Sequence, residues 1–126
     1  MKYLIPLALS FFIMQSAYAE KMTVYSQGAK FDPKACDITV DFSSFASGPD
    51  LRTRNAIEAS VKQNKDIISI RSYPWGKEGE STLCLKIRTG KEKTVYQLLL
   101  SIIPKEARAP TSLKNNIDGH SFSNAY

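Results

Sequence analysis

The side chains best suited to chemistry in this chain are two cysteines, Cys36 and Cys84, and a single histidine, His120. A catalytic thiol or hydroxyl needs a base held beside it, and a structural zinc ion needs four ligands at recognisable spacings. His120 lies in a polar stretch near the C-terminus, and the two cysteines stand far apart in the sequence. We therefore expect no thiol-based active site, no metal centre and no cofactor.

The acidic residues give no stronger indication of catalysis. Asp37 and Asp41 are four residues apart in a stretch that reads as a strand, so their Cα atoms should lie about 13 Å apart. This is too far for two carboxylates that act on one bond. Glu78 and Glu80 lie in an open loop, and the chain contains none of the common phosphate-loop, EF-hand, zinc-protease or nucleophile-elbow motifs. We expect a protein that is not an enzyme.

A more specific feature is the only tryptophan, Trp75, in the loop sequence "SYPWGKEGE". Trp75 could fold back as a lid over the core, or it could contact a partner. Tryptophan, tyrosine and arginine are the residues most often found at interface hot spots, and a rim of charged residues surrounds such contacts. The second interpretation gives a hypothetical partner-binding surface made of Arg71, Tyr73, Trp75, Lys77, Glu78 and Glu80.

The N-terminus has the pattern of a secretory signal peptide. Lys2 precedes an apolar run that is too short for a stable membrane span, and Ala17-Tyr18-Ala19 provides a small-x-small cleavage site. We expect cleavage after residue 19, a mature chain that starts at Glu20, and a periplasmic or secreted protein with no stable membrane insertion. Removal of residues 1–19 would leave 107 residues and, because one lysine is lost, reduce the net charge from +5 to +4.

Two cysteines in an exported chain favour one disulfide, Cys36–Cys84. Simple alternation, however, places Cys36 on the apolar face of its strand and Cys84 on the polar face of its own. We therefore expect Cys36 to lie just before its strand, where its side chain is free to turn, or a bulge to shift one of the two cysteines.

Apolar residues alternate with polar ones in several short stretches, as expected of strands with one buried face. The clearest is 36–42, and 66–73 and 81–88 form a predicted hairpin around the Trp75 loop, with Ile68 and Ile70 on one face. Residues 22–27 could add a short strand.

Two stretches have helical spacing. Residues 51–64 should form a helix with Ile57 and Val61 inward, preceded by Ser47 and Asp50 at the spacing of a capping box. Residues 93–103 fit a helix or a strand. We favour the helix, with Thr89 as its cap, because apolar residues recur at helical intervals.

These elements predict an α+β fold in the order (β)βαββα: a small antiparallel sheet of three to four strands, one or two helices packed on one face, and one disulfide. The order of elements resembles an incomplete ferredoxin-like arrangement. Residues 20–104 should form a single domain, and 105–126 should form a polar, mobile tail.

The lysines and arginines are scattered, so we expect no nucleic-acid partner, and the mild positive charge favours an acidic protein partner or an anionic envelope polymer. The sequence favours an exported binding module, in its most concrete form a small periplasmic inhibitor or immunity-like protein that docks on a partner protein. The alternatives are an accessory subunit of an envelope or secretion assembly, and a hydrolase that acts on an envelope polymer.

Overall fold

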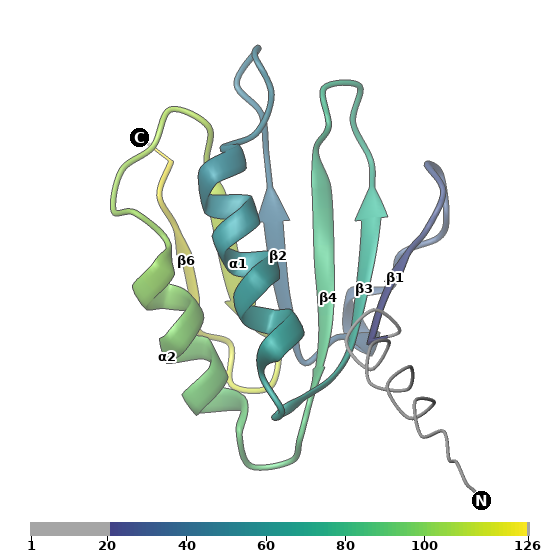
Figure 1. The fold of residues 1–126 in the computed structure, drawn as a ribbon, viewed down its shortest axis with the longest axis vertical. Coiled ribbons are helices and arrows are strands. Elements are labelled where there is room, and N and C mark those ends of the chain that lie inside the picture. Colours follow the sequence, from purple (N-terminus) through teal and green to yellow (C-terminus); the bar gives the residue numbers. More distant parts are fainter. Residues whose placement is uncertain (1–20, 126) are drawn as a thin grey trace, which may run out of the picture.

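A computed structural model of the chain describes residues 21–125 (Figure 1). The predicted signal peptide and its cleavage site lie outside the described residues. Within them the fold is α+β, with two α-helices, a six-stranded mixed sheet and one disulfide. In chain order the elements are β1 (Met22–Val24), a short 3-10 helix η3 (Pro33–Ala35), β2 (Ile38–Phe42), α1 (Leu51–Gln63), β3 (Ile67–Pro74), β4 (Ser81–Ile87), α2 (Glu92–Ile102), β5 (Thr111–Asn115) and β6 (Ser121–Ser123).

The sheet has the strand order β1-β3-β4-β2-β5-β6. β1 pairs with β3 in parallel, and the other neighbours pair antiparallel. β2-α1-β3 and β4-α2-β5 are two interleaved βαβ units, so the central part is a complete ferredoxin-like arrangement with one extra strand at each edge. The expected three to four strands and purely antiparallel sheet were therefore wrong in detail.

The largest difference lies in the C-terminal segment, for which the sequence predicted a polar, mobile tail. β5 instead pairs with the central strand β2 along its whole length, and β6 pairs with β5. Leu113 is only 1% exposed and lies in the core. The side chain of Asn124 accepts a hydrogen bond from the Thr111 backbone at 2.7 Å and donates one to the Pro104 carbonyl at 2.9 Å. The pattern was missed because β5 buries Thr111 and Asn115, which are polar.

Helix α1 begins where the sequence predicted, but its cap is Asp50 alone. The Asp50 carboxylate accepts hydrogen bonds from the backbone and the hydroxyl of Thr53, at 3.2 and 2.7 Å. Ser47 was expected to cap the helix, yet it lies exposed in the preceding loop. The inward positions Ile57 and Val61 are fully buried, as predicted.

Helix α2 settles the ambiguity of residues 93–103 in favour of the helix. Val95 and Leu99 are buried against the sheet at helical spacing. The expected cap at Thr89 is not formed: the N-cap position is Lys91, which makes no capping hydrogen bond with its side chain. Glu92 still reaches back and accepts a hydrogen bond from the Gly90 backbone at 3.0 Å.

Strand β3 contains an irregularity that changes which isoleucines are buried. The register with β4 shifts between Ile67 and Ser69. Ile67 is 2% exposed and Ile70 is fully buried, whereas Ile68 is 60% exposed. The expectation that Ile68 and Ile70 share the buried face was wrong, because a bulge inserts one residue and reverses the alternation.

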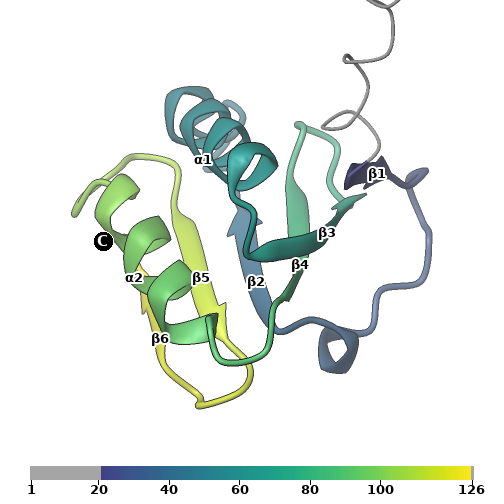
Figure 2. The same cartoon turned by 60° about the horizontal axis from the view of Figure 1, so that its bottom comes forward.

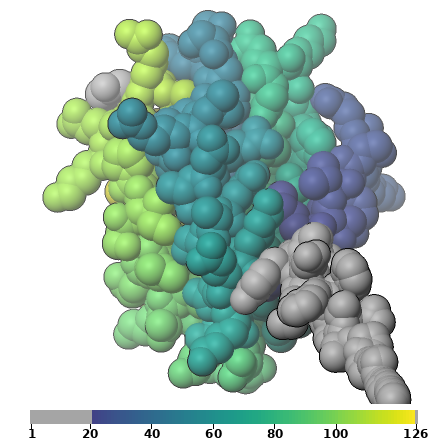
Figure 3. Space-filling view, in the orientation of Figure 1, coloured from purple at the N-terminus to yellow at the C-terminus, as the bar shows by residue number. Residues whose placement is uncertain are grey.

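Both helices cover the same face of the sheet, as predicted, and Figure 3 shows their side chains spread over it. Between the helices and the sheet lies a single apolar core, to which every strand except β1 and β6 contributes fully buried or nearly buried residues. Among residues 21–125, the opposite face carries no α-helix. In Figure 2 the segment between β1 and β2 bends round the β3 side of the sheet, away from both helices.

Candidate functional site

A row of side chains crosses the helix-free face of the sheet. Strand pairing aligns Tyr73 of β3 with Thr82 of β4, Thr82 with Asp41 of β2, and Asp41 with Ser112 of β5. Ser112 in turn pairs with Ser123 of β6, and their hydroxyls lie 3.2 Å apart. Because alternate residues of a strand point to the same face, this row stands on the side away from the core. It brings together one carboxylate, three hydroxyls and one phenol.

Part of this face is covered by residues 25–36, which we call the cover segment. Its aromatic rings pack on Tyr73: Tyr25 stacks at 4.6 Å between ring centroids, and Phe31 lies tilted at 5.0 Å. Gly28 provides the turn in this segment with a φ of 90°, a conformation that glycine adopts without steric cost. Tyr73 is therefore only 9% exposed and forms a second, small apolar cluster with the disulfide.

The disulfide Cys36–Cys84 holds the end of the cover segment on β4, as the sequence predicted. Cys36 follows η3 and precedes the first residue of β2. The expectation that it lies just before the strand proper, which reconciles the two opposite alternation patterns, is thus confirmed.

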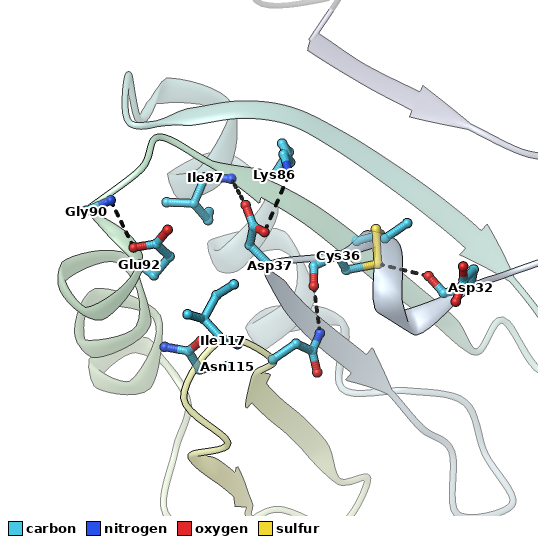
Figure 4. A network of polar contacts seen from close by, with 12 residues as sticks. Asp32, Cys36, Asp37, Lys86, Ile87, Gly90, Glu92, Asn115 and Ile117 are labelled. Atoms are coloured by element: carbon cyan, nitrogen blue, oxygen red, sulfur yellow. Dashed lines mark hydrogen bonds and ion pairs between the residues drawn. A yellow bond between two sulfur atoms is a disulfide. The ribbon is translucent and has the colours of Figure 1, made fainter.

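Asp37 and Asn116 fix the same end of the cover segment (Figure 4). The Asp37 carboxylate accepts a hydrogen bond from the Ile87 backbone at 2.8 Å and lies 3.6 Å from the Lys86 ammonium group. The Asn116 side chain donates to the carbonyl of Cys36 at 3.0 Å. Asp37 thus has a structural role at the start of β2, far from Asp41 at the other end.

Between the cover segment and the row lies a pocket with a volume of about 610 Å³. Its lining combines aromatic rings with a few polar groups, and Asp41 is its single charged residue. The residues that line it are Gln27, Gly28, Ala29, Phe31, Asp41, Ser43, Tyr73, Pro74, Trp75, Thr82 and Ser112.

Trp75 stands at the rim of this pocket and is 50% exposed. Its indole N–H donates to the hydroxyl oxygen of Thr82 at 3.0 Å, and the Thr82 hydroxyl donates to Oδ1 of Asp41. This chain fixes the orientation of the ring, because rotation about its side-chain bonds would break the indole hydrogen bond. Trp75 is neither a buried lid over the main core nor a freely rotating side chain.

The other residues of the predicted surface lie around the pocket without lining it. Arg71 is half-buried one row away, and its guanidinium donates to the Ala35 carbonyl at 3.3 Å. Lys77 is exposed in the β3–β4 loop. Glu78 accepts a hydrogen bond from the Ser44 hydroxyl at 2.7 Å, and Glu80 accepts one from the Glu78 backbone at 2.9 Å. These carboxylates therefore shape the loop, while Tyr73 and Trp75 face the pocket.

His120 lies in the turn between β5 and β6, with its side chain exposed and its Nδ1 atom 3.1 Å from Asp118. The hydrogen bond from the His120 backbone, followed by that from its side chain and by nearby positive charges, lowers the pKa of Asp118. No thiol or hydroxyl nucleophile is hydrogen-bonded to the His120 ring among residues 21–125. The same residues contain no cluster of acidic, cysteine or histidine side chains that could hold a metal ion.

Sequence reasoning missed Phe31, Asp41 and Thr82 as parts of one site. The alternation of apolar and polar residues does place Asp41 and Thr82 on the polar faces of their strands. What the sequence does not contain is the register, which sets Asp41 opposite Thr82, or the path that brings Phe31 over the sheet.

Comparison of the chain with protein-family models, with curated proteins and with solved structures gave no match. In the part of the chain that the structure describes, no helix has the length and apolar character needed to cross a membrane.

Proposed function

We propose that this protein is an exported binding module without catalytic activity, most concretely a small periplasmic inhibitor or immunity-like protein that docks on a partner protein. The observation that carries the proposal is the pocket on the helix-free face, with the half-exposed Trp75 fixed at its rim. The partner contacts this face through the pocket and the adjoining β3–β4 loop.

The support comes from the usual composition of protein interfaces. Aromatic residues are enriched where partner proteins bind, and a well-oriented ring loses little conformational entropy on binding. Trp75 is oriented in advance by its bond to Thr82, and Lys77 and Glu78 lie exposed nearby as a polar rim. The disulfide is compatible with an exported protein, because such bonds persist in oxidising compartments.

The test uses the mature chain as bait. The protein recovered from the periplasm should have the mass of a chain that starts at Glu20, and it should capture a partner from whole envelope in a one-to-one complex. Trp75→Ala should weaken this complex by about 2 kcal/mol, roughly thirtyfold, with little change in the urea midpoint because the ring is half exposed.

The matched control is Leu98→Ala, which removes a partly exposed apolar side chain from α2 on the helix-bearing side. It should leave the complex unchanged. Equal weakening by both variants would contradict docking at the helix-free face. Recovery only with membrane material would favour an accessory subunit, and hydrolysis of envelope polymer by the isolated protein would favour the enzyme alternative.

A further inference from the structure

The pocket combines aromatic rings with one carboxylate, and together they favour a positively charged ligand group. Its rings come from Phe31, Tyr73 and Trp75, and its charge comes from Asp41 alone. The faces of aromatic rings carry a negative potential and attract cations, most often the guanidinium group of arginine. A carboxylate beside such rings adds a charge-assisted hydrogen bond.

Asp41 has a carboxylate oxygen available for this contact. Oδ1 accepts the hydrogen bond from Thr82, whereas Oδ2 receives no hydrogen bond or ion pair from any residue in the described part of the chain. The carboxylate is half-buried, where charges are screened less than in bulk water.

The positive side chains of this face do not occupy the pocket. Arg71 and Lys114 stand in the next row, beside Cys84 and Thr39, and neither lines the pocket. The Arg71 guanidinium is turned toward the Ala35 carbonyl in the cover segment, 3.3 Å away. The pocket is thus a negative, aromatic site in a chain whose net charge is +5.

We propose that the pocket receives an arginine side chain of the partner protein, with the guanidinium against the exposed rings of Phe31 and Trp75 and hydrogen-bonded to Oδ2 of Asp41. This inference rests on the proposed function, since it specifies what the docked partner inserts. The overall positive charge of the protein therefore does not determine the contact at the centre of the interface.

The experiment uses the mature protein labelled with ¹⁵N and two probes, acetyl-Gly-Arg-Gly-amide and the same peptide with citrulline. Citrulline has nearly the shape of arginine but no charge. The arginine peptide should shift the amide signals of Asp41, Thr82 and the Trp75 indole, and should bind about tenfold more tightly than the citrulline peptide.

Asp41→Asn should remove this preference, because an amide keeps the shape of the side chain without its charge. The control Asp118→Asn removes an exposed carboxylate in the β5–β6 turn and should leave the preference unchanged. If Asp41→Asn does not fold, the comparison of the two peptides on the wild-type protein still decides the question. Equal binding of both peptides, or shifts that map outside the pocket, would overturn the inference.

The two proposals fail in different ways. A partner complex that forms at this face but is insensitive to Asp41→Asn overturns the arginine inference and leaves the proposed function standing. Specific arginine binding in a protein that captures no partner supports the pocket chemistry and contradicts the docking function.

Discussion

At the scale of single residues, local hydrogen bonds determine how the side chains of Trp75 and Asp50 are placed. The indole N–H of Trp75 is bound by the Thr82 hydroxyl, and Thr82 is placed by its pairing with Asp41 across the sheet. Asp50 has a comparable role at the start of α1, where it satisfies two donors of Thr53. In both cases the sequence indicates which residue is polar, but not which partner it finds.

The cap of α1 gives a prediction at this scale. Asp50→Ala should lower the free energy of unfolding by about 1 kcal/mol, because the Thr53 backbone N–H loses its acceptor. Ser47→Ala changes the residue that sequence spacing indicated as the cap and should have almost no effect. Urea denaturation followed by circular dichroism measures both. A larger loss for Ser47→Ala would place the cap where the sequence suggested and would contradict the structure.

At the scale of elements, α1 and β4 were predictable because the apolar residues that face the core follow helical spacing in α1 and strand spacing in β4. Residues 51–63 and 81–87 follow helical and strand periodicity closely. In β3 the sequence predicted Ile68 rather than Ile67 on the buried face. The two neighbouring residues are both isoleucine, so the sequence does not show where the bulge lies.

β5 was not predicted at all. Its apolar signal is one leucine, and its buried Asn115 is satisfied by local hydrogen bonds: the oxygen of its side-chain amide accepts from the Ile117 backbone at 2.9 Å. A strand that buries polar residues on its inner face has the composition of a loop. β4 pairs with only one edge of β2, so the other edge needs a partner strand, and β5 is that strand. This strand order cannot be read from the sequence.

The position of β5 in the core gives a second prediction. Leu113→Ala should lower the free energy of unfolding by about 2–5 kcal/mol, as large-to-small changes in a packed core do. The adjacent Lys114→Ala, on the exposed side of the same strand, should change it by less than about 0.5 kcal/mol. Urea melts distinguish these outcomes. If both variants were as stable as the wild type, residues 111–115 would not be part of the folded sheet.

At the scale of the whole molecule, the disulfide joins the cover segment to the sheet. Cys84 belongs to a central strand, and Cys36 ends a segment with little regular structure. The sequence separation of 48 residues is large, so in the chain-entropy model the bond restricts the unfolded chain considerably. It also keeps the cover segment, and with it Phe31, beside the pocket.

A third prediction follows for the bond. In protein taken from the periplasm, both cysteines should resist alkylation until a reductant is added. The free energy of unfolding of the double variant Cys36→Ala/Cys84→Ala should be about 2–5 kcal/mol lower than that of the oxidised wild type. The reduced wild type is the matched control and should be close to the double variant. Two freely alkylated thiols in the unreduced protein would contradict the bond.

The place of β5 also bears on when the molecule can fold. β2 needs β4 on one side and β5 on the other, and β5 begins only at residue 111 of 126. A chain that emerges N-terminus first therefore cannot complete its sheet until residues 111–115 are available. For a protein exported as we propose, the sheet would be completed only after residues 111–115 have crossed the membrane.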